Sequence, residues 1–311
     1  MTYLEQIGAT PAEAVQLVVV THWDDDHVRG IFRTVETCEA ADVACSIALA
    51  REDVIQFVMA QGAALGSESG VDELRSILLV TQERGHQIVW AKANTPLHPL
   101  PPGDTPIVVA LSPSDDAYQR GVTELIQRAT ELKSAIPRRY RAPEGPNGSS
   151  IVTSVRKAQF SVLLGGDLEH SNNANTGWMA IIDRACPPTK ASLVKVPHHG
   201  SEDAHYDGMW TELVADEPLA IVTPFMAGDH QLPGDRELSR LKRFARRLFV
   251  TASPTLVRAR YDSDVEKLVR DLHGKRIRRL RGWGHVRARR KMNGADEDWR
   301  IEVAGDAHQV V

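Results

Sequence analysis

The chain of 311 residues has few cysteines, no long apolar run and no secretory start. Its three cysteines, Cys38, Cys45 and Cys186, form no Cys-x-x-Cys pair and cannot all pair with one another, which is typical of thiols in a reducing cytosol. No apolar stretch approaches the ~20 residues of a membrane span. The first eleven residues lack the basic start and apolar core of a signal peptide. These absences predict a soluble, cytoplasmic protein.

Apolar residues are plentiful and make up 42% of the chain, enough for a core. A length of 311 residues exceeds a typical domain, although α/β sandwiches of this size often form one unit. Periodicity predicts helices over residues 28–40, 51–64, 71–84, 115–135, 176–184, 206–215, 235–248 and 262–273. It predicts strands over 17–20, 43–49, 87–91, 106–111, 150–156, 159–164, 192–196 and 219–223. A hairpin of 284–290 with 298–304 is expected near the C-terminus.

Side chains that can bind metals are concentrated directly after the apolar run from Leu17 to Val20. This β-branched run is typical of a buried strand, and His22, Asp24, Asp26 and His27 follow it. Alternate residues of an extended chain point the same way, so the first three can converge on one point while His27 serves a second. Such crowded carboxylates raise one another's pKa unless a cation is present. The alternative is a solvated acidic loop with an aspartate that caps the next helix.

Two later apolar runs also end in residues that can bind metals. Residues 161–164 precede Gly165-Gly166-Asp167, and residues 192–196 precede Pro197-His198-His199-Gly200-Ser201. Binding sites of layered α/β folds lie at the carboxyl ends of strands. Three such strand ends in this order therefore predict one site built from distant segments.

The order His-x-Asp-x-Asp-His, Gly-Gly-Asp and Pro-His-His-Gly-Ser resembles the metallo-β-lactamase-like hydrolase superfamily. It looks closest to the branch that contains the nuclease-like domain of the ComEC DNA-uptake protein. The likeness runs from about Val15 to Ser253 and includes an Asn-x-x-Ser segment that starts at Asn147. It implies an α/β fold, an αββα sandwich with a two-metal site along one edge. We expect this domain over residues 1–254, with a helical insertion at about 51–135, and a basic extension over 255–311.

Two departures from the family pattern affect these expectations. Family members normally have several strands before the first motif, which here starts at His22. A partner chain or an upstream segment is therefore expected to cover that sheet edge, unless the edge lies open. Most members also carry a further histidine in a His-x-x-Gly-His context, and neither His86 nor His98 has such surroundings.

The resemblance assigns ligands for two divalent ions, Zn²⁺ or Mn²⁺: His22, Asp24, Asp26, His27, Asp167 and His199. Asp167 would bridge the ions, with His22 and Asp24 on one and the remaining ligands on the other. Asp24 stands where zinc-typical members have histidine, and this carboxylate-rich mixture makes Mn²⁺ a competitor of Zn²⁺. His199 is preferred over His198 as the ligand because it directly precedes Gly200.

Catalysis would use a metal-bound water, which loses its proton far more easily than bulk water. The predicted catalytic residues are Asp26, His198 and His230. His198 would donate to a phosphoryl oxygen or protonate the leaving group. His230 would replace the missing imidazole or contact phosphate; the alternative is a loop histidine without a role. Asp25, Lys195, His205 and His285 are expected to be solvent-facing, capping or structural residues.

The net charge of −4 hides an uneven distribution. Residues 236–291 contain 19 Lys and Arg against 5 Asp and Glu, and the rest of the chain contains 18 against 36. Phosphate backbones are a common partner of such a basic segment. The predicted nucleic-acid contacts are Arg246, Arg247, Arg276, Arg278, Arg279 and Arg281. The alternative is a solvated basic face whose charges pair with acidic residues elsewhere in the chain or contact an acidic partner.

The leading prediction is a metal-dependent phosphodiester hydrolase, a nuclease that cuts DNA with a metal-bridging hydroxide. By analogy it would act as a regulated effector in bacterial antiviral defence. One alternative is a small-molecule phosphodiesterase or lactonase. Another is a catalytically degenerate subunit that binds a partner.

Overall fold

A computed structural model describes residues 2–22, 24–50, 55, 70–98, 106–121, 123, 146–227, 230–252, 255–258, 278–281, 283–291 and 298–311. By its contacts the chain divides into two compact units. The first contains Met1–His198 and Asp203–Asp216, and the second contains His199–Glu202 and Glu217–Val311. This division lies elsewhere than the predicted domain boundary at residue 254.

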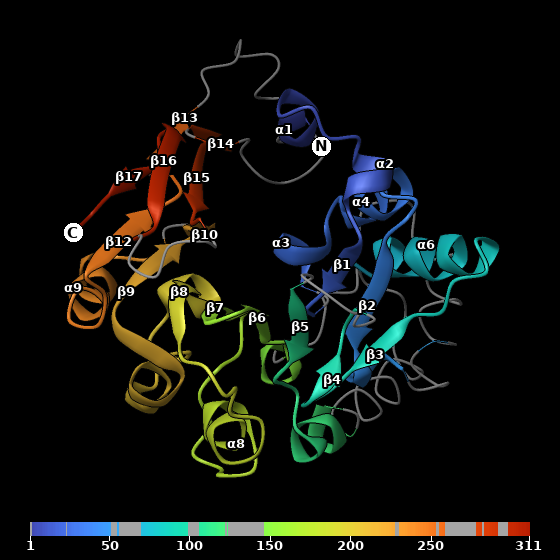
Figure 1. Cartoon of the computed structure of the whole chain (residues 1–311), viewed down its shortest axis with the longest axis horizontal. Coiled ribbons are helices and arrows are strands. Elements are labelled where there is room, and N and C mark those ends of the chain that lie inside the picture. The colour runs from blue at the N-terminus through green and yellow to red at the C-terminus, as the bar shows by residue number, and fades with distance from the viewer. Residues whose placement is uncertain are drawn as a thin grey trace. The chain divides into compact units, whose positions relative to one another are not determined.

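A parallel sheet of three strands opens the first unit. Its order is β1 (Leu17–Val20), β2 (Asp42–Ser46) and β3 (Val89–Ala91). Helices α4 (Ile31–Thr37) and α6 (Gly70–Glu83) lie beside it (Figure 1). Shorter helices are α1 (Thr2–Gln6), α2 (Pro11–Ala14), α3 (Asp25–Val28) and the 3-10 turn η1 (Ile47–Leu49).

The three-stranded sheet is buried on both faces. Val43 and Cys45 of β2 pack in one apolar cluster with Ile77 of α6. Ala44, between them, belongs to a second cluster that contains Ala110 of the next sheet. Successive side chains of a strand point to opposite faces, so one face meets the helices and the other meets strands. This explains why the apolar runs are continuous.

The second layer of the first unit is a mixed sheet. Its strands lie in the order β8 (Ala191–Lys195), β7 (Phe160–Leu164), β6 (Thr153–Lys157), β5 (Ile107–Ala110) and β4 (Thr95–Pro96). β7 and β8 are parallel, and the other neighbours are antiparallel. Helix α8 (Gly177–Arg184) contributes Trp178, which is buried and donates its indole N–H to the carbonyl of Ala204 at 3.0 Å. The protein is therefore of mixed α/β type, as the sequence predicts.

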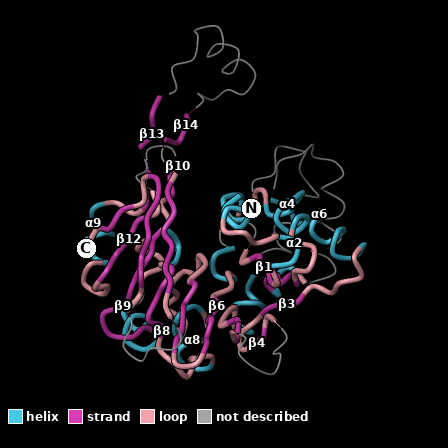
Figure 2. The backbone as a smooth tube through the Cα atoms, turned by 45° about the horizontal axis from the view of Figure 1, so that its top comes forward, coloured by secondary structure: helices cyan, strands magenta, loops and turns pink. Residues whose placement is uncertain are grey.

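The second unit is mainly β-structure (Figure 2). β12 (Arg247–Val250) pairs in parallel with β9 (Val214–Val222) and antiparallel with β17 (His308–Gln309). The described part of this unit also contains three separate antiparallel strand pairs. They are β10 (Phe225–Ala227) with β11 (His230–Leu232), β13 (Thr255–Arg258) with β14 (Arg278–Arg281), and β15 (Gly284–Arg289) with β16 (Arg300–Gly305). The last pair confirms the predicted closing hairpin. Among the described residues of the second unit, the one helix longer than a single turn is α9 (Asp235–Leu241).

Three predicted helices are wrong in extent or type. The helix expected at 235–248 ends at Leu241, because the following apolar residues are buried in β12 and tertiary burial overrides local helix propensity. The segment 206–215 contains only the π-helical turn η4 (Met209–Leu213) before β9 starts. The helix expected at 28–40 already starts at Asp25 and is interrupted at Gly30, which has a left-handed φ of 84°.

Some predictions fall on residues that are not described: the helices at 51–64 and 262–273 and most of that at 115–135. Helix α6 confirms the one expected at 71–84. Cys38 and Cys45 are buried, Cys186 is exposed, and none of the three forms a disulfide. Within the described part of the chain, every helix is too short or too polar to cross a bilayer.

Candidate metal centre

Hydrogen bonds join the predicted strand ends of the first unit. The amide of Ile151 donates to the carbonyl of Thr21 at 3.0 Å, just after β1. After β7, the amide of Gly165 donates to the carbonyl of Lys195 at 3.1 Å. The amide of His198 donates to the carbonyl of Gly166, also at 3.1 Å. The last two bonds join the loops after β7 and β8, and His27 Nε2, 2.9 Å from Asp167 Oδ2, brings the loop after β1 to the loop after β7. The three loops therefore meet, as the sequence pattern predicts.

A cluster of aspartate and histidine side chains at this place could hold a metal ion. Asp26, His27 and Asp167 each offer a ligand atom, and these atoms lie within 4.8 Å of one another. His27 Nε2 is 2.9 Å from Asp167 Oδ2 and 3.7 Å from Asp26 Oδ2. The Asp167 side chain is only 4% exposed, and a buried carboxylate needs a cationic or hydrogen-bonded environment.

His22 lies beside this cluster as a neutral imidazole. Its ring centroid is 4.3 Å from that of His27, and its Nε2 is 3.8 Å from Asp24 Oδ2. Burial, followed by the charge of His27, lowers the pKa of His22 to about 3. Nδ1 is within hydrogen-bond distance of the hydroxyls of Thr21 and Ser150, at 3.0 and 3.3 Å.

The other ring nitrogen of His22 fits a metal ligand. Nε2 is buried and makes no hydrogen bond with the residues that the structure describes. Histidines that bind metals use one ring nitrogen for the ion and donate the other to a neighbouring group. The donor set of His22, Asp24 and the cluster therefore suits a divalent ion of the intermediate type.

The backbone before Asp167 requires glycine. Gly166 has a φ of 53°, and a Cβ there would lie 2.6 Å from Ser150 Oγ and 2.7 Å from the carbonyl oxygen of Ile151. Ser150 Oγ in turn accepts a hydrogen bond from the amide of Asp167 at 3.0 Å. Because only glycine adopts this conformation without strain, the Gly-Gly-Asp sequence fixes where the carboxylate of Asp167 lies.

Lys195 is closer to the centre than the sequence indicates. Its Nζ lies 3.7 Å from Asp167 Oδ1 and 3.3 Å from the carbonyl oxygen of Gly166. Burial lowers the pKa of Lys195, and the charge of Asp167 acts in the opposite direction. The prediction gave Lys195 a structural or surface role. Its place at the end of a buried strand, two residues before Pro197-His198-His199, could have indicated that it lies near the site.

Asn147 and Glu169 also contact a predicted site residue. The amide nitrogen of Asn147 donates to Glu169 Oε1 at 2.9 Å and lies 3.5 Å from His198 Nε2. His198 Nδ1 is 3.6 Å from the same oxygen of Glu169. The position of Glu169, two residues after Asp167, is the feature of the sequence that could have indicated its place near the site. These two side chains lie beside the ring of His198.

His199 belongs to the second unit by its contacts. Its Nδ1–H donates to the carbonyl of Thr223 at 2.9 Å, and its ring stacks on Phe225 with centroids 5.0 Å apart. A carbonyl can only accept, so Nε2 is the acceptor atom of this ring, as a metal ligand needs. His198, His199 and Gly200 all have positive φ, at 43°, 53° and 81°. The ligand role of His199 stays a prediction.

The structure describes the backbone of His230 and Asp25 but not their side chains. His230 starts β11 opposite Ala227, but its side chain is outside the described residues, as is that of Asp25. Their roles therefore stay predictions.

Two of the predicted nucleic-acid contacts already pair with carboxylates of their own unit. Arg246 lies 3.2 Å from Glu217, and Arg247 lies 3.3 Å from Asp298. Arg278, Arg279 and Arg281 stand on β14, whose backbone alone is described, and Arg276 is outside the described residues. The ion pairs of Arg246 and Arg247 agree with the alternative, in which the basic face pairs with acidic residues of the same chain.

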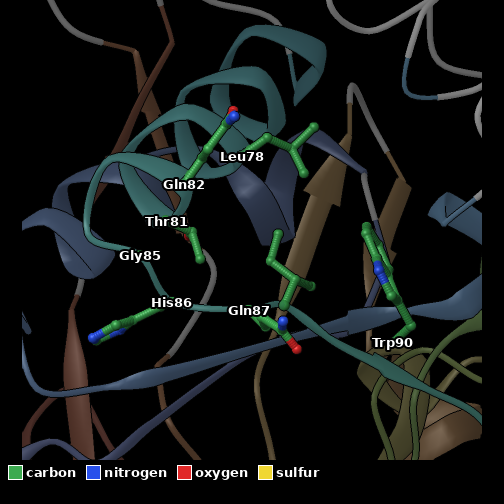
Figure 3. A pocket seen from close by; sticks show the side chains of 8 residues that line it. Leu78, Thr81, Gln82, Gly85, His86, Gln87 and Trp90 are labelled. Atoms are coloured by element: carbon green, nitrogen blue, oxygen red, sulfur yellow. The ribbon is translucent and has the colours of Figure 1, made fainter.

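A cavity of about 520 Å³ opens elsewhere in the first unit, between α6 and the strand β3. Figure 3 shows Leu78, Thr81 and Gln82 on the helix side and Trp90 on the strand side. None of the cluster residues lines it. The cavity therefore gives no support to a small-molecule pocket at the metal centre.

Comparison with known proteins assigns no family to this chain. A scan against protein-family models found no match, and neither did a search of curated proteins. Inferences about function therefore depend on the residues and geometry described above.

Proposed function

We propose that this protein is a metal-dependent phosphodiester hydrolase, a nuclease that acts on DNA and has the αββα fold of metallo-β-lactamase-like hydrolases. The observation that supports this most is that Asp26 and His27, which follow β1, meet Asp167, which follows β7. When bound, a Zn²⁺ or Mn²⁺ ion supplies an acidified water and offsets charge on a phosphoryl group. An anionic phosphodiester suits such a centre better than a neutral lactam or thioester does.

The side chains of the chain itself divide the remaining work. Asp26, His27 and Asp167 hold the ion, and His22, Asp24 and His199 are the further proposed ligands. His198 faces the substrate and donates a proton to the departing oxygen, oriented by Asn147 and Glu169. We assign to Asp26, the most exposed of the three cluster ligands, the further role of accepting a hydrogen bond from the attacking water.

A direct test compares substrates and metals. The purified full chain, stripped of metal with EDTA, is incubated with plasmid, linear and single-stranded DNA, with RNA and with bis(p-nitrophenyl) phosphate. Mn²⁺, Mg²⁺ or Zn²⁺ is then restored. We expect cleavage of DNA only with metal, and its loss in His27→Ala and His199→Ala. Cleavage that persists in EDTA, or in both variants, would contradict the proposal. Turnover of the small diester without any cleavage of polynucleotide would favour the small-molecule alternative.

His198→Gln is expected to lower kcat on DNA by about 10²–10⁴-fold, the range for general acid–base catalysis, with KM and metal content little changed. The loss should shrink with bis(p-nitrophenyl) phosphate, because p-nitrophenolate departs without protonation. Steady-state rates on both substrates measure this, with His205→Gln as the control, since His205 pairs with Asp207 at 2.7 Å. An equal loss on both substrates would refute a proton-donor role.

Arg278→Ala combined with Arg279→Ala should weaken DNA binding and make it less dependent on salt. Each lost phosphate contact reduces the slope of log affinity against log salt by about 1. Fluorescence anisotropy with labelled DNA from low to moderate salt measures both quantities. Lys92→Ala is the control, because Lys92 lies in the first unit and pairs with Asp115 at 2.9 Å. An unchanged slope would assign the basic segment to another role.

The sheet edge formed by β1 bears on possible protein partners. Among the described strands, β1 pairs only with β2. We propose that the expected partner or upstream strand pairs on the other edge of β1, since an open strand edge is a template for pairing. A role as a regulated effector in antiviral defence depends on such a partner and is proposed by analogy alone.

A further inference from the structure

The two carboxylate oxygens of Asp167 face different groups. Oδ2 lies 2.9 Å from Nε2 of His27, on the side of the Asp26 and His27 ligands. Oδ1 lies 3.7 Å from the ammonium nitrogen of Lys195. A carboxylate that bridges two ions through both of its oxygens offers one oxygen to each of them. At this carboxylate, one of the two oxygens already has a cation beside it.

The position of Lys195 is fixed by the fold. It is the last residue of β8, and its Cα pairs with that of Leu164 in β7. Its carbonyl accepts from Gly165, and its ammonium group donates to the carbonyl of Gly166 at 3.3 Å. The side chain is 27% exposed, so it runs along the protein instead of extending into solvent.

The candidate ligands of the first unit form two groups. The ligand atoms of Asp26, His27 and Asp167 lie within 4.8 Å of one another. His22 and Asp24 form a pair with 3.8 Å between Nε2 and Oδ2. A second ion at this pair that took Oδ1 of Asp167 as a further ligand would meet the ammonium group there. Like charges at such short range repel strongly in a poorly solvated site.

We propose that the ammonium group of Lys195 takes the place of a second metal ion at Oδ1 of Asp167. The chain then holds one divalent ion tightly, on Asp26, His27 and Asp167, and a second ion only weakly, at His22 and Asp24. This inference rests on the proposed metal-dependent function and replaces the expectation of two equivalent ions. Lys195 is a positioning residue that sets metal stoichiometry.

The experiment titrates the full chain, stripped of metal, with Mn²⁺ alone. Isothermal titration calorimetry gives the stepwise affinities, and electron paramagnetic resonance counts free Mn²⁺ and detects coupled pairs of ions. The wild-type protein should bind one ion, with a second step weaker by about 10–100-fold, the size of effect that neighbours of a metal site commonly have. Lys195→Met should strengthen the second step by a similar factor and produce the coupled signal. Lys195→Arg, which keeps the charge, should behave like the wild type.

The controls keep the outcomes distinct. Lys190→Met removes an exposed lysine of the same unit, and circular dichroism verifies folding; if Lys195→Met does not fold, Lys195→Gln takes its place. Two equally tight ions in the wild type, or an unchanged second step in the variant, would overturn the inference and leave the proposed function intact. A wild-type protein that binds no Mn²⁺ and cleaves nothing would overturn the proposed function and this inference together.

Discussion

Asp167→Asn is expected to abolish metal-dependent phosphodiester hydrolysis while the protein remains folded. The amide has nearly the volume of the carboxylate but no charge, so a buried group 2.9 Å from His27 and 3.7 Å from Lys195 can no longer attract a divalent ion. Loss of an outer neighbour of a metal site costs about 10–100-fold in affinity or activity. Loss of a central ligand should exceed that range.

Initial rates on DNA and on bis(p-nitrophenyl) phosphate, with Mn²⁺ binding measured in parallel, test this expectation. Asp183→Asn is a matched control, because Asp183 is an exposed carboxylate that pairs with Arg184 on the surface at 3.2 Å. It should retain the wild-type rate and metal content. A folded Asp167→Asn protein with near wild-type turnover would remove this centre as the active site.

Gly166→Ala is expected to destabilise the protein by about 2–5 kcal/mol and to abolish activity as well. A left-handed conformation costs a residue with a Cβ about 1–2 kcal/mol. Overpacking against fixed neighbours adds about 1–3 kcal/mol, because the new Cβ would lie 2.7 Å from the backbone oxygen of Ile151. The movement that relieves this contact also displaces Asp167, which is the next residue.

Gly85→Ala separates the two contributions. Gly85 has a similar φ of 67°, but a Cβ there would meet nothing within 4 Å. It should therefore cost only the conformational part, about 1–2 kcal/mol. Urea unfolding followed by circular dichroism gives both free energies of unfolding. If both variants lower the free energy of unfolding by the same amount, the short distance between a Cβ at residue 166 and the carbonyl oxygen of Ile151 does not constrain this position.

The sequence predicted the three segments that build the metal centre. Each is a short apolar run followed by residues that can bind metals. The backbone bonds of Gly165 and His198 and the contact of His27 with Asp167 bring these segments together. The strands could be predicted because strand formation and the turn after it depend on local composition. The same local rules predicted α6 and the hairpin of β15 with β16.

Local rules failed where burial and strand register decide the outcome. The segment from Lys242 to Leu248 was expected to continue a basic helix, but α9 ends at Leu241 and β12 starts at Arg247, where the apolar side chains are buried. Likewise, no local pattern shows that Lys195 faces Asp167, since that contact depends on the pairing of Leu164 with Lys195.

By itself the sequence therefore determined which residues can bind a metal and at which strand ends they stand. The tertiary structure alone decided that the ammonium group of Lys195 stands near one oxygen of Asp167, and that Asn147 and Glu169 lie beside the ring of His198. The reason is physical: such contacts join side chains from separate segments, and only the packed register of the strands sets their distances.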